Sequence, residues 1–342
     1  MFVSQSRIGR IENRYEWLNR EIKQSKEVIE SKGFPCVFGV QGHKKEVHFY
    51  SALNYPYSPE ELSKDIDLYL NELKKMPKKD RGISGLLVYF EPIGNMSIHA
   101  KQFMVWQVLS SMKNKYGYKK DNIDNNPLDD GYAYRFKNEL WFINFSSNSY
   151  RHRKSRNLGA FITLAMQTLS KSDEYFNYNM ETKAKAQKNV RKLAEKYDGC
   201  PVHSGLGPVI GSGKFSPAKL SYFIGDNNSE KSYEPWKFQA FRPQKIILDE
   251  SIISENGPQV KHFECLYGNE KIKRYSNCKE EHDINENNLL VTNSSDLVDL
   301  YNSNIQIATF NKNIASEYNV FDIDYMNDLL ALRFIKDNAI YN

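Results

Sequence analysis

The chain has 342 residues, 40% apolar and 13% aromatic. This composition excludes a wholly disordered protein, because disordered chains lack the aromatic residues whose burial offsets the entropy lost on folding. The 47 basic and 42 acidic residues are interspersed and leave a formal charge of +5, too weak a field to argue for nucleic acid as a partner. No run approaches the roughly 18 apolar residues of a spanning helix, and the first residues lack the features of a secretory signal. We expect a globular cytoplasmic protein with no membrane partner.

The first residues of the chain predict a helix followed by a hairpin of two strands. Apolar residues at Tyr15, Leu18, Ile22 and Ile29 have helical spacing over 13–31, and Gly33 supplies a left-handed stop. Residues 36–40 and 47–50 then have the composition of two strands around a polar turn at 42–45.

A second helix is indicated by a capping box. Ser58 and Glu61 enclose Pro59 at the first helical position, and apolar residues then line one face up to Pro77. These apolar residues are Leu62, Ile66, Tyr69, Leu70 and Leu73.

The middle of the chain predicts alternating strands and helices. A buried strand is expected at 86–90, followed by a helix through Phe103, Trp106, Leu109 and Met112. Aromatic segments at 132–136 and 140–145 predict another hairpin, and further strands are expected at 158–166 and 220–224. Between them lie a charged helix over 182–196, which stops at Gly199 and Pro201, and a glycine-rich loop over 205–213.

Beyond Trp236 the composition shifts to Asn, Ser, Glu and Lys, with a strand expected at 245–248 and a closing helix at 325–335. The fold class is therefore α+β, a mixed and largely antiparallel sheet with flanking helices, plus a C-terminal extension. We expect the α+β domain to cover residues 1–235 and the extension, whose role is open, to cover 236–342.

Cys36 is the first candidate for chemistry. It follows Pro35, which stiffens the chain, and lies between Phe34 and Phe38. A thiolate in such a place can ligate haem iron, and the two rings could lie against a porphyrin. The alternative is a small buried residue at the start of a strand, which is the usual place of a free cysteine. Cys200, Cys265 and Cys278 are the other cysteines, and four scattered cysteines are too few for a disulfide framework.

A second candidate is the basic loop 148–157, which holds Arg151, His152, Arg153, Lys154 and Arg156. Guanidinium groups suit carboxylates and phosphates, so haem propionates or a substrate carboxylate could bind here. The alternative is a solvated loop whose charges pair with scattered acids.

His203 follows Cys200 and Pro201 and could be an imidazole ligand or a proton relay, although a lone histidine after proline is more often structural. The glycines that follow do not form a phosphate-binding loop. No Gly-Lys-Ser/Thr appears at the required spacing, and the next expected element is a strand rather than a helix.

The extension contains a spacing typical of zinc sites. His262 and Cys265 are followed by Cys278 and His282, four N and S ligands that could bind a structural zinc in a segment without a good core. The ligand order is unusual, and short motifs of this kind also arise by chance.

Several strings together resemble the YqcI/YcgG family. They include Phe34-Pro35-Cys36 with Phe38-Gly39, the helix with Trp106 and Leu109, and the turn Asn126-Pro127-Leu128-Asp129-Asp130. They continue with Phe136, Trp141-Phe142-Ile143, Arg151, Ser155-Arg156, Met166-Gln167, Arg191, Tyr197-Asp198, His203 to Gly207, Leu220-Ser221-Tyr222 and Asp226-Asn227. The resemblance covers about residues 22–226, while the extension has no counterpart in it.

The resemblance implies a haem-dependent oxidoreductase, because some members of the family hydroxylate a nitrogen of arginine or a related guanidine. Cys36 would then ligate the iron of haem b, Arg151, Arg153 and Arg156 would hold propionates or a substrate carboxylate, and His203 would be a distal proton donor or the alternative ligand. The partners would be a small-molecule substrate and an electron donor, with a homodimer as a further expectation. The alternative is a non-enzymatic haem-binding or interaction module with a zinc-stapled extension.

Overall fold

The computed structural model describes residues 1–10, 16–55, 57–93, 98–122, 127, 132–206, 218–228, 232 and 235, and five strands between 245 and 322. Its contacts divide the chain into two compact units. The first holds residues 1–93 and 108–236, and the second holds 94–107 and 237–342. The boundary expected at 235/236 stays a prediction.

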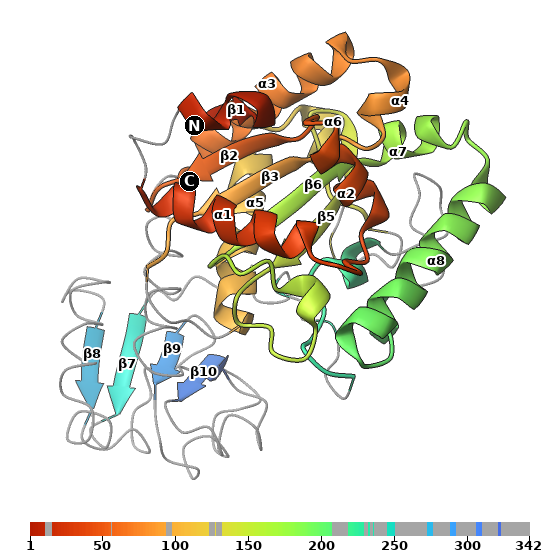
Figure 1. Cartoon of the computed structure of the whole chain (residues 1–342). Helices are drawn as coiled ribbons and strands as arrows, with labels where there is room; N and C mark the ends of the chain where they lie inside the picture. Colours follow the sequence, from red (N-terminus) through yellow and green to blue (C-terminus); the bar gives the residue numbers. More distant parts are fainter. Residues whose placement is uncertain are drawn as a thin grey trace. The chain divides into compact units, whose positions relative to one another are not determined.

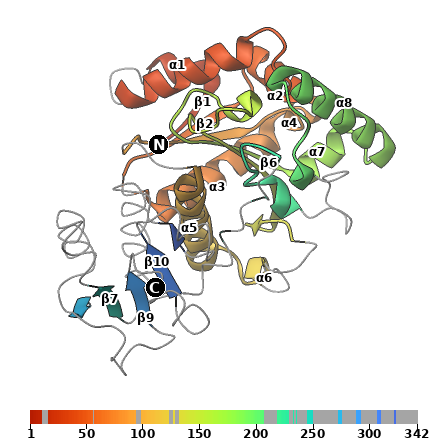
Figure 2. The ribbon, with the colours of Figure 1, turned by 90° about the horizontal axis from the view of Figure 1, so that it is seen from below.

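The first unit is built on a six-stranded mixed sheet with helices on both faces, so the α+β class is confirmed. The strand order is β1-β2-β3-β6-β5-β4, and the strands are β1 (Phe2–Ser4), β2 (Phe49–Leu53), β3 (Leu86–Phe90), β4 (Arg135–Phe136), β5 (Glu139–Ser146) and β6 (Thr163–Thr168). Only the β2–β3 pair is parallel within this sheet; its other pairs are antiparallel. Figure 2 shows α1 and α2 on one face and α3 on the other.

The N-terminal segment contains the 3₁₀ turn η1 (Gln5–Arg10), α1 (Glu16–Glu30) and α2 (Val37–Lys44). Helix α1 confirms the helical spacing, and Gly33 has the expected positive φ of 88°. The hairpin prediction was wrong, because residues 37–44 are helical and the strand begins at Phe49. A short apolar run with small residues does not distinguish a strand from a helix.

Tertiary packing favours the helix at α2. A Cβ on Gly42 would lie 2.4 Å from the Ile83 carbonyl oxygen and 2.5 Å from the His48 ring. The missing side chain therefore lets the helix lie directly against the chain beside β2 and β3. The spacing of residues in the sequence does not predict that close approach.

Strands β2 and β3 are joined by α3 (Pro59–Lys75) and the short α4 (Lys78–Arg81), a crossover that makes the parallel pair. The predicted capping box is present, since the Glu61 backbone N–H donates to Ser58 Oγ at 3.2 Å. Leu62, Ile66, Tyr69 and Leu73 are almost completely buried. The predicted apolar face of this helix is thus part of the core.

The next elements are α5 (Ile98–Tyr116), the short α6 (Lys119–Asn122) and the β4–β5 hairpin, followed by the 3₁₀ turn η2 (Lys154–Arg156) and β6. The helix, the hairpin and the 86–90 strand were all predicted. The strand expected at 158–166 begins only at Thr163, because the preceding segment bonds to other parts of the chain. The Asn148 backbone N–H donates to the Ala160 carbonyl, and that of Phe161 donates to the Glu21 carboxylate.

Helices α7 (Leu169–Tyr175) and α8 (Met180–Asp198) follow, then the 3₁₀ turns η3 (Ser204–Leu206) and η4 (Ala218–Ser221). Helix α8 was predicted, with its stop at Gly199, where φ is 73°. The strand predicted at 220–224 is absent, and η4 occupies its start. Tyr222 lies deep in the core, where its Oη accepts from the Tyr134 N–H and donates to the Trp141 carbonyl. The apolar run is therefore buried against the β4–β5 region without forming a strand. Most of the predicted glycine-rich loop lies outside the described residues.

The second unit contains a five-stranded sheet in which every pair is parallel, with the order β11-β10-β9-β7-β8. Its strands are β7 (Lys245–Asp249), β8 (Ile272–Tyr275), β9 (Asn288–Val291), β10 (Gln306–Thr309) and β11 (Phe321–Asp322). The strand at 245–248 was predicted, and the helix expected at 325–335 lies outside the described residues. In the part of the chain that the structure describes, no helix is long and apolar enough to cross a membrane.

Candidate functional site

The first turn of α2 positions Cys36. This residue precedes the helix, and its carbonyl accepts the Val40 backbone N–H at 2.9 Å. A Cβ on Gly39 would lie 3.1 Å from Cys36 Sγ, so glycine at that position leaves room for the sulfur. The thiol is thereby placed at the amino end of a helix, where backbone N–H groups and the helix dipole favour negative charge.

Opposing effects act on the pKa of the half-buried Cys36 thiol. Burial raises this pKa, while the Gly39 backbone N–H, the positive charge of Arg156 and the Phe38 N–H act to lower it. The net direction is upward. The groups that oppose the effect of burial on the pKa are those that stabilise a thiolate. The site therefore suits a thiolate when a cation bound to the sulfur compensates for desolvation.

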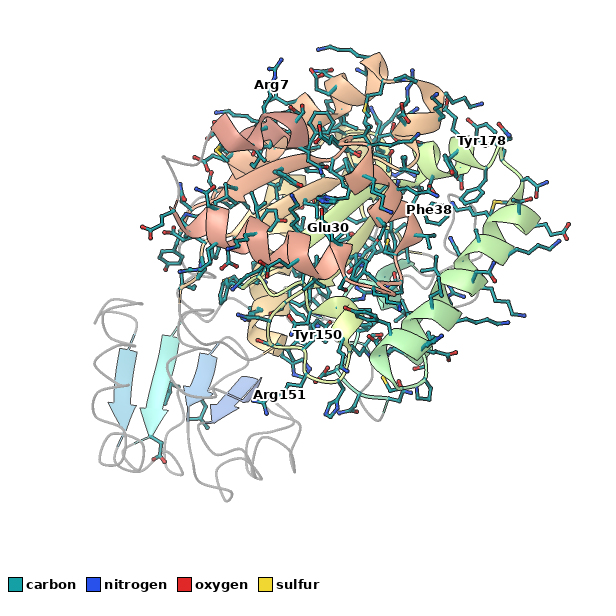
Figure 3. The ribbon with its side chains drawn as sticks, viewed as in Figure 1. Arg7, Glu30, Phe38, Tyr150, Arg151 and Tyr178 are labelled. Carbon is teal, nitrogen blue, oxygen red and sulfur yellow. The ribbon has the colours of Figure 1, made fainter. Side chains whose placement is uncertain are left out.

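Aromatic rings flank the Cys36 segment on two sides. The Phe34 ring packs edge-on against Tyr197 of α8 at 5.8 Å between centroids. The Phe38 ring packs edge-on against Tyr175 at 5.9 Å and Phe176 at 5.7 Å. These contacts anchor the start of α2 to the α7–α8 segment (Figure 3 labels Phe38).

The three arginines of the basic loop have different environments. Arg156 is buried, and its guanidinium donates to Asn144 Oδ1 at 2.8 Å and to the carbonyls of Phe145 and Ser221. Burial lowers the pKa of Arg156. Its hydrogen bonds hold the guanidinium in place, and its positive charge acts on the Cys36 thiol.

Arg153 is also buried, and its guanidinium donates to Asn228 Oδ1 and to the carbonyls of Gly225 and Pro201. Arg151 is exposed, and Figure 3 shows it at the edge of the first unit. Of the three predicted anion-binding arginines, Arg151 is the one whose side chain faces solvent, while the other two bind protein carbonyls.

Two carboxylates fix the backbone of the loop. Asp226 accepts the backbone N–H groups of Arg151, His152 and Arg153 at 2.9 to 3.1 Å. Asp198, at the end of α8, accepts the Ser155 N–H at 2.6 Å and the Ser155 hydroxyl at 2.7 Å. Charge alone did not predict these roles. Each acid is far from the loop in sequence, and no local pattern marks it.

His203 is 1% exposed, and its Nδ1 accepts the Gly205 backbone N–H at 3.0 Å. The Arg153 guanidinium bonds to the Pro201 carbonyl, which joins this segment to the basic loop. Two links thus connect the predicted site residues: Arg153 bonds to the His203 segment, and the charge of Arg156 acts on Cys36.

The predicted zinc ligands His262, Cys265, Cys278 and His282 all lie outside the described residues. Within the described part of the chain, no three His, Cys, Asp or Glu side chains form a metal-binding group. Zinc binding by the extension stays a prediction.

Residues 25–236 match the YqcI/YcgG family over well more than half of the sequence. The chain belongs to the YqcI/YcgG family. The matched region begins in α1 and includes the Cys36 segment, the basic loop and both carboxylates that hold it.

Two curated relatives belong to the same family. The uncharacterized protein YqcI of Bacillus subtilis strain 168 is 25% identical over 232 residues, which cover 65% of this chain and 85% of that protein. "Putative N(omega)-hydroxy-L-arginine synthase DcsA" of Streptomyces lavendulae is 23% identical over 240 residues, which cover 67% of this chain and 86% of that protein. No solved structure is significantly similar to the chain. This YqcI/YcgG chain thus has a relative whose name denotes N-hydroxylation.

Proposed function

We propose that the chain is an oxygenase that hydroxylates a nitrogen of an amino acid or guanidine-type small molecule, with haem b held through Cys36. The observation that carries the proposal is the place of the Cys36 thiol, at the amino end of α2 with the Arg156 charge nearby. The relationship to DcsA supports the choice of reaction.

The donor set of the site fits haem. P450-type haem oxygenases use a thiolate ligand, which donates electron density to the iron and favours cleavage of the O–O bond. Cys36 Sγ is half-buried and accepts the Gly39 N–H. A bare thiolate there would be destabilised by desolvation, and a bond from the sulfur to iron would offset that cost. Cys200, the other described cysteine, follows the end of α8 rather than preceding a helix.

The protein's part in the reaction is to hold the haem, to orient the substrate and to exclude water. One O₂, two electrons and two protons would convert an N–H to an N–OH and release one water, with the electrons supplied by an external donor. The exposed Arg151 guanidinium is available to bind a substrate carboxylate or a haem propionate. The buried Arg153 and Arg156 would act by holding the loop in shape, since their guanidinium groups already bind carbonyls.

An absorption spectrum tests the haem ligand. The full chain is expressed with a haem precursor, and its spectrum is recorded before and after dithionite and carbon monoxide. We expect the Soret shift typical of thiolate-ligated haem, and we expect Cys36→Ser to abolish or move it. Cys200→Ser is the matched control and should leave the spectrum unchanged.

Turnover is then measured with L-arginine and related guanidines as substrates, with dithionite or a reduced carrier as the electron source, by mass spectrometry of the N-hydroxylated product. Absence of haem at any loading would overturn the proposed function. An unchanged spectrum in Cys36→Ser would remove Cys36 as the ligand and point to His203, for which His203→Ala is the direct test.

A further inference from the structure

Helix α8 carries an unusual arrangement of charge. Lys185, Lys188, Lys192 and Lys196 are all exposed. Their spacing of three or four residues places them on one face of the helix. Helix α8 has a single buried residue among its 19, Lys183, whose ammonium pairs with the buried Asp173 of α7. The lysine stripe is therefore on the face opposite the one that anchors the helix.

The carboxylates that could neutralise this stripe are used elsewhere. Glu195 accepts the Val202 N–H at 3.1 Å, and Asp198 binds Ser155. Among the described residues, Lys185 pairs with Glu181 at 2.7 Å, while Lys188, Lys192 and Lys196 have no ion pair.

The other long amphipathic helices of the first unit are organised differently. Lys26 of α1 pairs with Glu30, and Lys64 and Lys75 of α3 pair with Glu60 and Glu72. These pairs lie one turn apart, which is the ordinary arrangement of a solvated face. Among the described residues, Lys23 of α1 and Lys74 of α3 also lack an ion pair, so α8 differs in placing three such lysines in one row.

Exposed apolar side chains accompany the stripe. Tyr178 is 68% exposed, Met180 46% and Leu193 38%, three of the six most exposed large apolar residues of the described chain. Asn177 and Tyr178 both have positive φ, 52° and 57°, without being glycine. Such backbone costs free energy, and it persists here because the Tyr178 N–H bonds to the Asp173 carbonyl at 2.8 Å. Figure 3 labels Tyr178 at the turn between α7 and α8.

The same helix borders the Cys36 segment. Tyr197, in its last turn, packs against Phe34 and bonds through its hydroxyl to Ser31 Oγ at 3.1 Å. Phe38 packs against Tyr175 and Phe176, just before α8 begins. A protein bound on α8 would lie about one helix diameter, roughly 10 Å, from the segment that holds the thiol.

We infer that the α8 surface, formed by Tyr178, Met180, Lys188, Lys192, Leu193 and Lys196, docks a small acidic electron-carrier protein. This inference rests on the proposed function, which needs two electrons from outside the chain. Lysines that lack partners would meet carboxylates of the carrier, and Tyr178 would supply the apolar anchor, as tyrosine often does in interfaces. The stripe from Lys185 to Lys196 is about 17 Å long at 1.5 Å per residue, and electron-transfer partners are among those that associate through small interfaces.

A protein partner is favoured over a nucleic acid or a membrane. Leu193 is exposed one turn before Lys196, and the exposed Tyr178 and Met180 lie at the start of the helix. Nucleic-acid surfaces, in contrast, are more polar and more strongly basic. The stripe carries three unpaired charges, fewer than the clusters that bind anionic membranes.

Binding of an acidic ferredoxin and an acidic flavodoxin to the full chain, measured by calorimetry at low and high salt, tests the inference. We expect binding at low salt that weakens as salt is raised. Charge reversal of Lys188, Lys192 and Lys196 to Glu should weaken it roughly tenfold or more, and Tyr178→Ala should weaken it with no change in salt dependence.

The control is the same charge change at another exposed face, Lys74, Lys78 and Lys79 to Glu, which should leave binding intact. Circular dichroism checks that each variant is folded. Equal weakening by both triple variants, absence of binding to either carrier, or binding of a DNA duplex or anionic vesicles through the same lysines in place of the carriers would overturn the inference. Because no turnover is required, this outcome is distinct from failure of the haem spectrum or of N-hydroxylation.

Discussion

Single residues in the first unit are held by close contacts that also set their chemistry. His48 is 5% exposed; its Nδ1 accepts the Gly85 N–H at 3.0 Å, and its Nε2–H donates to the Gly39 carbonyl at 2.9 Å. Burial, with a smaller effect of the nearby His43, lowers the pKa of His48 to about 4. The ring is thus neutral in the fold, and its two hydrogen bonds join α2 to the starts of β2 and β3.

A pH dependence of stability follows from His48. An unfolded histidine has a pKa of 6.5, so between about pH 6.5 and pH 4 the unfolded state binds a proton that the folded state does not. The free energy of unfolding should fall by about 2 kcal/mol between pH 7.5 and pH 5 because of this residue. His48→Gln should remove that difference, as measured by urea unfolding at both pH values. If the variant has the same pH slope as the wild type, this account of His48 fails.

At the scale of the element, α2 shows how a missing side chain decides packing. Gly42→Ala places a Cβ 2.4 Å from a backbone oxygen and 2.5 Å from the His48 ring, so we expect a loss of about 2 to 3 kcal/mol. Gly85→Ala is the matched control, because its Cβ would lie 3.6 Å from its neighbours, an ordinary contact. Urea unfolding compares the two, and an equal loss at both positions would contradict the packing argument.

Sequence patterns predicted the helices that are marked by their own apolar periodicity or by capping residues. Helix α3 has the Ser58 cap, and α8 ends at Gly199. The errors fell on α2 and on 220–224, short apolar runs whose form depends on neighbours distant in sequence, such as Ile83 for Gly42 and Trp141 for Tyr222. Periodicity within a short run cannot carry that information.

At the scale of the whole molecule, the candidate site could be predicted in part. The Cys36 segment and the basic loop were located from residue type and spacing, and the family of the chain is shown by the match over 25–236. The pairing of Asp226 and Asp198 with the loop, and the burial of Arg153 and Arg156, could not be predicted, because they depend on contacts far apart along the chain.

The contacts also set an expectation for truncation. Residues 94–107, which include the first half of α5, group with residues 237–342 in one compact unit. A chain cut after Trp236 would therefore keep those residues without the rest of their unit, and apolar side chains such as Met104, Val105 and Trp106, each at most 1% exposed, would lose burial. We expect the 1–236 fragment to bind more of the hydrophobic dye ANS and to unfold at a lower temperature than the full chain, as measured by fluorescence and calorimetry. A fragment with the same melting temperature and no added dye binding would mean that the first unit does not depend on the second, and would support the boundary at 235/236.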